Sequence, residues 1–305
     1  MLSFLLKRFG QSLITLLFVS FMAYSLTFLV GSPVDALLPS DATAADAERL
    51  TRDLGLDKPL YVQYGKFLQR AVRGDFGESI KWRGESAMGM VFQRLPATLR
   101  LSGIALLGSL MISIPVGVLA AVKKNSWFDK FAKMIALLGQ ALPPFWLGII
   151  LIWIFGVLLG WLPAGGDGTF KHIILPAIAL GWYQVAAILR LTRSAMLDSM
   201  DSEYIKLGRM KGVSESRIIW IHALRNACIV PLTYLGLLIG TIITRTVVVE
   251  TVFGWPGTGT LVMQAVLGRD FPVITAMIVT FSAIFIAVSL IMDVLYAIID
   301  PRIRI

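Results

Sequence analysis

The feature that most constrains this chain is a series of long apolar runs, each near the roughly 20 residues that a helix needs to cross a bilayer. The runs lie at residues Phe9–Val30, Ala97–Val122, Met134–Gly160, Ile173–Leu191, Ala227–Val249 and Val273–Ile299. Only 15% of the residues are charged, whereas a soluble domain carries about a quarter. Backbone groups inside a bilayer must satisfy one another, and these runs are too long for barrel strands. The sequence therefore predicts an all-α integral membrane protein with about six transmembrane helices, because a soluble protein does not need six such core helices.

The net charge of +9 raises the question of a nucleic-acid partner, and the positions of the basic residues answer it. With the N-terminus inside, the cytoplasmic segments hold most of the Lys and Arg, while the short outer loops hold only Lys171 and Arg269. This asymmetry follows the positive-inside rule and places both termini in the cytoplasm. The basicity is thus a signal of topology, and no nucleic-acid partner is expected.

Residues that would carry catalysis or a cofactor are absent from the sequence pattern. Cys228 is the only cysteine, and the two histidines, His172 and His222, fall on opposite sides of the membrane in this topology. We therefore expect no disulfide, no metal site and no cofactor. The chain also lacks the P-loop motif and any paired-carboxylate or Ser/His/Asp constellation, so we do not expect an enzyme.

Segment 32–96 is the one sizeable region on the predicted outer side. Pro59 is suited to the start of a helix, after which Tyr61, Tyr64, Leu68 and Ala71 share one face at helical spacing. The chain then divides into residues 1–31 with the first span, an extracytoplasmic helical segment at 32–96 and a core at 97–305. The outer helix would lie on the membrane or cap the bundle, or it would contact a delivery protein, and these readings are compatible.

Prolines and one charge mark unusual positions within the spans. Pro143 and Pro144 interrupt the third run, so that helix must kink or unwind locally, which favours a place against protein or a water-filled cavity. Arg245 lies within the fifth run, and an ionisable residue at that depth is a functional candidate. It would either line a pathway or have a structural role, by snorkelling outward or by pairing with Glu250.

The polar stretch at 198–226, between the fourth and fifth runs, interrupts the membrane pattern on the cytoplasmic side. Asp201 is suited to begin a short helix that stops at Gly212, and Ser214 to begin a second helix. Two short helices joined at a glycine form a protruding elbow, which basic residues make positive. A basic loop attracted to anionic lipid is the simpler alternative, and the glycine between two helices favours the elbow.

The elbow carries a recognisable signature. It reads Glu203-Tyr204-Ile205-Lys206-Leu207-Gly208-Arg209-Met210-Lys211-Gly212, followed by His222-Ala223-Leu224-Arg225-Asn226-Ala227. This resembles the cytoplasmic signature of ABC-importer permeases of the dipeptide/oligopeptide/nickel family, with Gly208 and Met210 in place of the usual alanines. The stretches at 54–64, 73–77, 162–166, 174–177, 250–259, 269–273, 293–296 and 300–304 are similar to that family's first, B-type, permease subunit. Arg245 departs from it, because the family commonly has a small residue there.

The resemblance implies a type I importer permease fold and specific partners. These partners are a second homologous permease subunit, two cytoplasmic ATPase subunits that hydrolyse ATP, and an extracytoplasmic solute-binding protein. Coupling to the ATPase through the 201–213 elbow would involve Glu203, Tyr204, Arg209, Lys211, Gly212, His222, Leu224 and Asn226. Contact with the binding protein would involve Glu250, Trp255, Pro256, Gly257 and Asp270. The translocation pathway would involve Arg245, Pro143 and Pro144.

The functional hypothesis is a non-catalytic permease subunit of the bacterial cytoplasmic membrane, which forms half of a pathway for peptides or similar small solutes. Nickel complexes, opines and glutathione are alternative cargoes. A self-contained secondary transporter or channel is the alternative class. It predicts inverted repeats or carboxylates at the membrane midplane, and the sequence shows neither.

Overall fold

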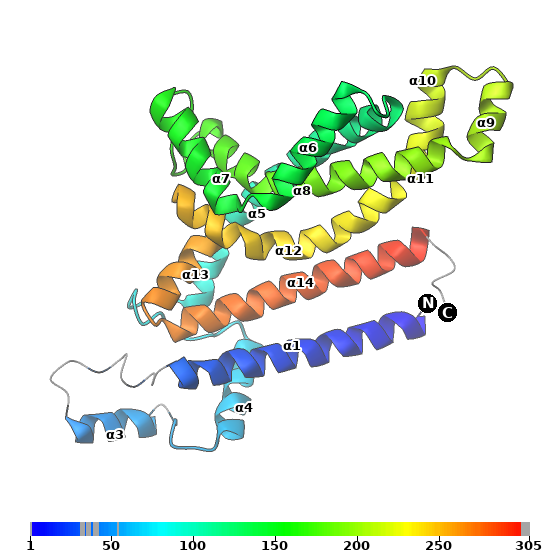
Figure 1. Ribbon diagram of the computed structural model, residues 1–305. Coiled ribbons are helices and arrows are strands. Elements are labelled where there is room, and N and C mark those ends of the chain that lie inside the picture. The colour runs from blue at the N-terminus through cyan, green and yellow to red at the C-terminus, as the bar shows by residue number, and fades with distance from the viewer. Residues whose placement is uncertain (1, 31–33, 35–37, 39–42, 54, 300–305) are drawn as a thin grey trace. The chain divides into compact units, whose positions relative to one another are not determined.

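The computed structural model describes residues 2–30, 34, 38, 43–53 and 55–299 (Figure 1). Within these residues every regular element is a helix, and the one β contact is an isolated bridge between Glu78 and Ser86. The prediction of an all-α protein is therefore confirmed. The C-terminal stretch at 300–304 lies outside the described residues.

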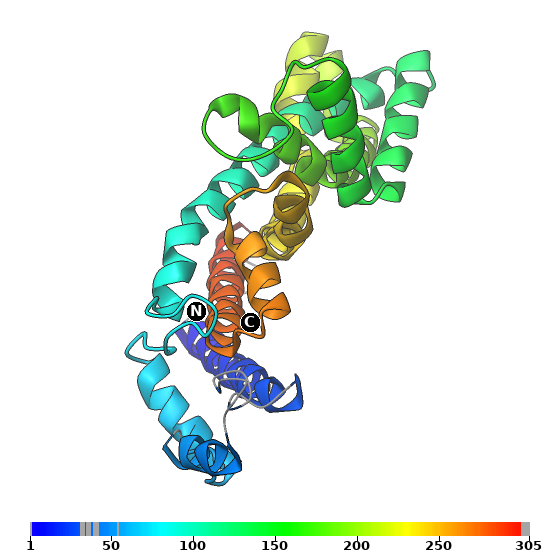
Figure 2. The same ribbon diagram turned by 90° about the vertical axis from the view of Figure 1, so that its left-hand side faces the viewer.

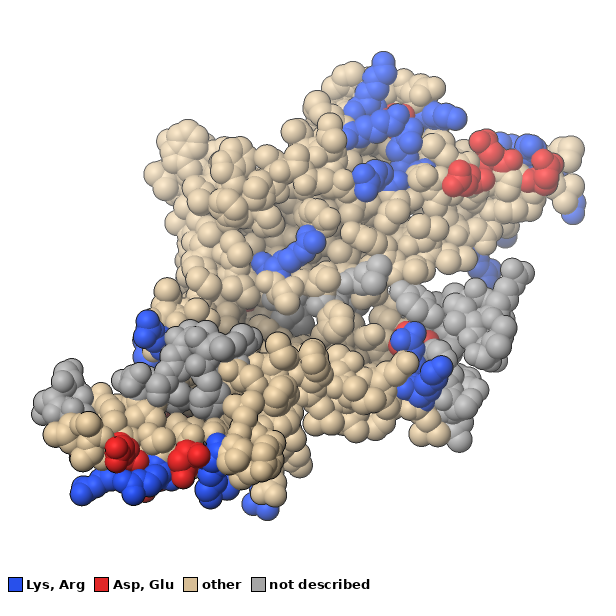
Figure 3. Space-filling view, turned by 60° about the horizontal axis from the view of Figure 1, so that its bottom comes forward, with Lys and Arg blue, Asp and Glu red and all other residues tan. Residues whose placement is uncertain are grey.

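Apolar helices of membrane-spanning length are the main feature of the described chain. Four are long enough, Ala87–Val122, Phe170–Met200, Glu215–Gly236 and Phe271–Val294, and a bent pair over 127–158 raises the number to five. The first predicted run also forms a helix, α1 (Leu2–Val30). The side chains at both its ends lie outside the described ones, and α1 is not among the four or five spans counted above. Much of the face in Figure 3 carries no charged side chain, as expected of a surface that faces lipid.

The chain divides into two compact units, one of residues 1–97 with 257–305 and the other of residues 98–256. This division concerns packing. The predicted segments 1–31, 32–96 and 97–305 concern topology across a membrane, and they stay a prediction.

The first unit contains α1, α3 (Ala44–Asp53), α4 (Leu60–Ala71), α13 (Thr258–Leu267) and α14 (Phe271–Ile299). Helix α1 runs along α14, and Figure 2 shows α13 beside α14. An ion pair of 3.3 Å joins Arg8 of α1 to Asp293 of α14. The core of this unit includes Phe67 of α4, Leu261 of α13 and Met277 of α14.

Helix α4 begins after Pro59, as predicted, and Tyr64 and Ala71 of the predicted face pack against this core. Its buried residues are Gln63 and Phe67, whereas Tyr61 is 75% exposed. Tyr64, half-buried, shares a hydrogen bond of 2.7 Å with Ser20 of α1. Gln63, buried beside this face, donates to the carbonyls of Leu56 and Lys58 in the preceding loop.

The second unit is built around α8 (Phe170–Met200), against which α6 (Trp127–Ala141), α7 (Pro144–Leu151) and α12 (Ile229–Phe253) pack. Helix α5 (Ala87–Val122) begins ten residues before the predicted Ala97 and extends into both units. Glycines let the helices approach closely. A Cβ on Gly117 of α5 would lie 2.8 Å from Thr192 of α8, and one on Gly139 of α6 would lie 2.6 Å from Ala186 of α8.

The third predicted run is broken at the two prolines, as expected. Helix α6 ends at Ala141, Pro143 is extended, and Pro144 takes the first position of α7, where its missing N–H costs nothing. The axes of the two parts differ by 108°, and a π-helical segment, η1 (Ile152–Leu158), follows α7. The prolines therefore make a sharp corner rather than a bend in one helix.

Candidate functional site

The predicted elbow is present as α9 (Glu203–Met210), which follows directly on the end of α8. Ser202, not the predicted Asp201, is its N-cap residue, because α8 continues to Met200 and takes Asp201 as its own C-cap. Helix α9 ends in a Schellman motif, in which Gly212 N donates to Arg209 O and Val213 N to Gly208 O. Gly212 has φ +75°, so the left-handed residue that this motif requires is a glycine.

The second predicted elbow helix is the beginning of the next span. Ser214 is the N-cap of α10 (Glu215–Arg217), as predicted, and η2 (Ile218–Ala223), α11 (Leu224–Ala227) and α12 follow with only Cys228 between them. Four consecutive large apolar residues at 218–221 explain why this helix continues into an apolar span and does not end beside the elbow.

One buried residue and one hydrogen-bond network hold the elbow to the helix ends. Ile205 of α9 is 1% exposed and packs with Met196 of α8 and Ile218 of η2. The hydroxyl of Tyr204 lies 2.6 Å from Ser199 Oγ and accepts a hydrogen bond of 2.8 Å from Asn226. Burial opposes ionisation of Tyr204, but its hydrogen bonds outweigh that effect and lower the pKa of the phenol. Movement of α9 is therefore tied to the ends of α8 and α11.

The free side of the elbow is apolar in the middle and charged at its edges. Leu207 is 48% and Met210 77% exposed, in a helix of only eight residues. Exposed ion pairs flank them, Lys206 with Glu203 and Arg209 with Glu215, each at 2.8 Å. Figure 3 shows these two signs of charge intermixed on that part of the surface. An exposed apolar patch with a charged rim is typical of a protein contact.

The structure brings most of the predicted coupling residues into this elbow. Glu203, Tyr204 and Arg209 lie on α9, and Lys211 and Gly212 end it. Asn226 bonds to Tyr204, and Leu224 packs against the cluster that holds Ile205. His222 is exposed in η2.

Arg245, the predicted pathway residue, has an aromatic partner. Its guanidinium lies 4.2 Å from the centre of the Tyr183 ring of α8, which is cation–π geometry. Glu250 accepts a hydrogen bond of 2.6 Å from Thr98. The structural pair of Arg245 with Glu250 stays a prediction.

The residues predicted to contact a binding protein are mostly buried. Glu250, Trp255, Gly257 and Asp270 are all below the surface, and Pro256 alone is partly exposed. Asp270 accepts hydrogen bonds from Ser79 Oγ and from the backbone N–H of Lys81, which ties the loop at 77–86 to the start of α14. These side chains hold loops in place and do not form an exposed contact surface.

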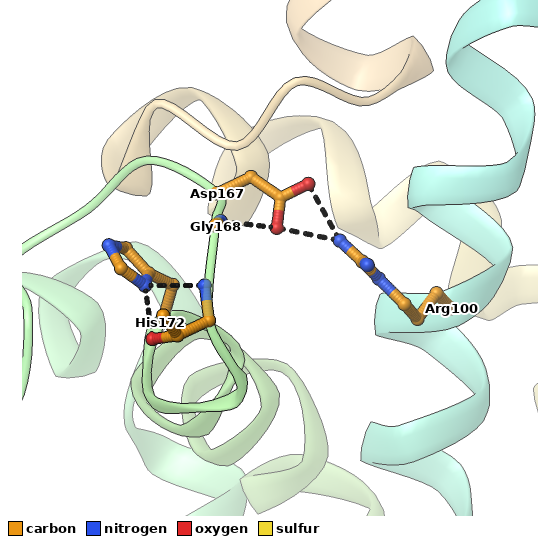
Figure 4. Close-up of polar contacts among 5 residues, drawn as sticks. Arg100, Asp167, Gly168 and His172 are labelled. Carbon is orange, nitrogen blue, oxygen red and sulfur yellow. Dashed lines mark hydrogen bonds and ion pairs between the residues drawn. The ribbon is translucent and has the colours of Figure 1, made fainter.

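The sequence reading missed a charged cluster in the second unit, shown in Figure 4. Arg100 Nη2 of α5 lies 2.7 Å from both carboxylate oxygens of Asp167, and its guanidinium lies 4.9 Å from the ring centre of Trp255. Thr169 and His172 form a capping box at the start of α8 beside it. The sequence did carry a signal for Arg100, because a charged residue inside the predicted span that starts at Ala97 is a functional candidate.

Comparison with known proteins places the chain among transport proteins. Residues 113–305 match the family described as the inner membrane component of binding-protein-dependent transport systems, and residues 1–102 match the N-terminal region of such membrane components. The chain belongs to this family. It is thus a multi-pass permease of the inner membrane, a non-catalytic subunit whose system includes an ATPase and a binding protein.

Curated relatives of this permease align over its full length. The oligopeptide transport system permease protein AppB of Bacillus subtilis is 39% identical over 315 residues, covering 100% of both chains. The glutathione transport system permease protein GsiC of Escherichia coli K12 is 39% identical over 305 residues, covering 100% of this chain and 99% of its own. The di/tripeptide transport system permease protein DppB of Pseudomonas aeruginosa is 38% identical over 335 residues, with the same coverage. The resemblance to B-type permeases of peptide importers is therefore confirmed.

Proposed function

We propose that this permease forms one half of a translocation pathway, beside a second homologous permease subunit. Two cytoplasmic ATPase subunits and an extracytoplasmic solute-binding protein complete the importer. The observation that carries this proposal is the elbow, which presents exposed Leu207 and Met210 on a helix anchored by buried Ile205. Such a helix needs a protein partner to cover it.

The elbow is proposed to transmit ATPase movement to the spans. Because Tyr204 is bonded to Ser199 of α8 and to Asn226 of α11, a partner that shifts α9 moves the ends of both helices. Rigid-body movement of packed helices is an established way to open and close a site. Both termini then lie in the cytoplasm, on the same side as the elbow, and segment 32–96 lies outside.

The proposed cargo is a short peptide or a similar small solute. The printed names of the relatives refer to oligopeptides, di- and tripeptides and glutathione, which are all peptides with free carboxylates. Arg245 on its Tyr183 ring, with the corner at Pro143 and Pro144, is the proposed lining of the pathway within this subunit. Pro256 and the loops held by Glu250 and Asp270 are the proposed contact with the binding protein.

The test is reconstitution of the permease with its partner permease, ATPases and binding protein in proteoliposomes. We expect uptake of radiolabelled di- or tripeptide that requires both ATP and the ATPase subunits. Uptake that persists without the ATPase would support a secondary transporter instead. Unchanged uptake of an anionic peptide by Arg245→Gly would remove Arg245 from the pathway.

A further inference from the structure

A cavity of about 190 Å³ lies in the second unit beside the cluster of Figure 4. Its lining includes Arg100 of α5, the turn that carries Asp167, Thr169 and Phe170 at the start of α8, and Trp255 after α12. In the proposed topology these elements lie at the outer face of the permease. The cavity is therefore on the side from which a solute would arrive.

Arg100 is the charged group of this cavity, and it is only partly engaged. Nη2 alone contacts Asp167, at 2.7 Å from each oxygen, and 51% of the Arg100 side chain is exposed. Across the described part of the chain, Nε and Nη1 of Arg100 donate to no protein group. A guanidinium has five N–H donors in a planar fork, and it binds a carboxylate best through two nitrogens.

We propose that Arg100 binds the terminal carboxylate of an arriving solute, in place of Asp167. A carboxylate that engages two nitrogens of the fork makes a stronger pair than Asp167, which engages one. The exchange leaves the positive charge of Arg100 paired throughout, and the charge that loses its partner is the carboxylate of Asp167. Asp167 retains a hydrogen bond of 2.8 Å from Gly168 N, and its side chain is 31% exposed to water.

The remaining walls fit one end of a small peptide. The ring of Trp255 lies 4.9 Å from the guanidinium, and Phe170, 73% exposed, also lines the cavity. Cavities that enclose whole small molecules measure about 300–1,000 Å³, so this smaller one holds a terminal residue and leaves the rest of the solute outside. The chemical class that matches is a small solute with a free carboxylate.

This inference rests on the proposed function for its topology and cargo, so its test uses a binding measurement that needs no transport. Cys228, the only cysteine, is changed to serine, and Phe170→Cys places a thiol in the cavity wall. The permease is purified with its partner subunits. The rate of labelling by N-ethylmaleimide is then measured with N-acetyl-alanyl-alanine and, separately, with its C-terminal amide.

We expect the free acid to slow labelling several-fold and the amide to leave it unchanged. Arg100→Gln should abolish the protection, and Asp167→Asn should give the same protection at a several-fold lower concentration because the competing carboxylate is gone. Lys171→Gln is the matched control, since it removes the same charge from an exposed neighbour that does not line the cavity, and protection should persist.

Equal protection by acid and amide, or protection that survives Arg100→Gln, would overturn the inference. Equal protection by inorganic phosphate would replace it with a general anion site. If the complex imports peptides but the acid gives no protection, this inference fails and the proposed function stands. If protection depends on Arg100 but no peptide is imported, the proposed cargo fails instead.

Discussion

Arg193 of α8 holds the fully buried carboxylate of Asp129 of α6, with its Nη2 2.9 Å from Oδ2 and its Nε on the other oxygen. The backbone N–H of Asn125 donates to the same carboxylate at 3.0 Å. Lys133, one turn along α6, adds a contact of 3.0 Å from a side chain that is 49% exposed. The start of α6 is thus fixed to the C-terminal half of α8 by one bidentate pair.

We predict that Asp129→Ala lowers the free energy of unfolding by about 3–5 kcal/mol, because it leaves Arg193 largely buried without its partner. Lys133→Ala should cost no more than about 1 kcal/mol, since its pair with Asp129 is half-exposed and screened. Thermal unfolding of the detergent-purified permease measures both. An equal loss of unfolding free energy in the two variants would show that the ion pair of Asp129 with Arg193 is not what fixes α6 to α8.

Two glycines of α5 should respond to alanine with opposite signs. A Cβ on Gly117 would lie 2.9 Å from the carbonyl oxygen of Leu189, whereas one on Gly108 meets nothing within 4 Å. We expect Gly117→Ala to destabilise the protein by about 1–3 kcal/mol through overpacking. Gly108→Ala should stabilise it by up to about 1 kcal/mol through helix propensity. The same unfolding assay compares them, and a neutral Gly117→Ala would show that α5 and α8 are not in close contact.

Gly212 should be replaceable only by residues that accept a left-handed backbone. A Cβ there meets nothing within 4 Å, so the constraint is φ +75° and not space. Gly212→Val should abolish peptide-stimulated ATP hydrolysis in the assembled importer, and Gly212→Asn should retain much of it, since asparagine tolerates this region. Gly208→Ala, in open space within α9, is the control and should be harmless. Normal coupling in Gly212→Val would remove the Schellman turn from the mechanism.

Asp270 should control the order of the loop at 77–86. Its buried carboxylate accepts from Ser79 Oγ and from Lys81 N, so Asp270→Ala leaves donors unsatisfied at a cost of about 1–3 kcal/mol. Amide hydrogen exchange in the loop should accelerate by roughly tenfold or more. Asp75→Ala removes one exposed hydrogen bond, to Gly77 N, and should change exchange little outside that turn. A loop that stays protected in Asp270→Ala would show that other contacts hold it.

The sequence predicted the features that follow from local chemistry. Long apolar runs must be helices in a bilayer, Pro143 and Pro144 must break a helix, and Gly212 fits a left-handed turn. Ser202 was missed as the N-cap of α9 because Asp201 is an equally good capping residue and only the end of α8 decides between them.

Features that depend on partners distant in the chain could not be predicted. Close contacts between helices occur at Gly117, Gly139 and Gly181, whose partners on other helices are not visible in the sequence. Asp270 looked like an exposed loop residue until Ser79 was found against it. The partner of Arg100, Asp167, is likewise far from it in the sequence.

A cross-linking experiment tests most directly whether an external ATPase attaches at α9. In the Cys228→Ser background, Met210→Cys places a thiol on the exposed side of the elbow, and Leu267→Cys, 79% exposed at the end of α13, is the control. A short bifunctional maleimide is applied to the active importer. We expect a cross-link from position 210 to the ATPase and none from position 267. An active importer in which position 210 gives no ATPase cross-link would contradict attachment at α9.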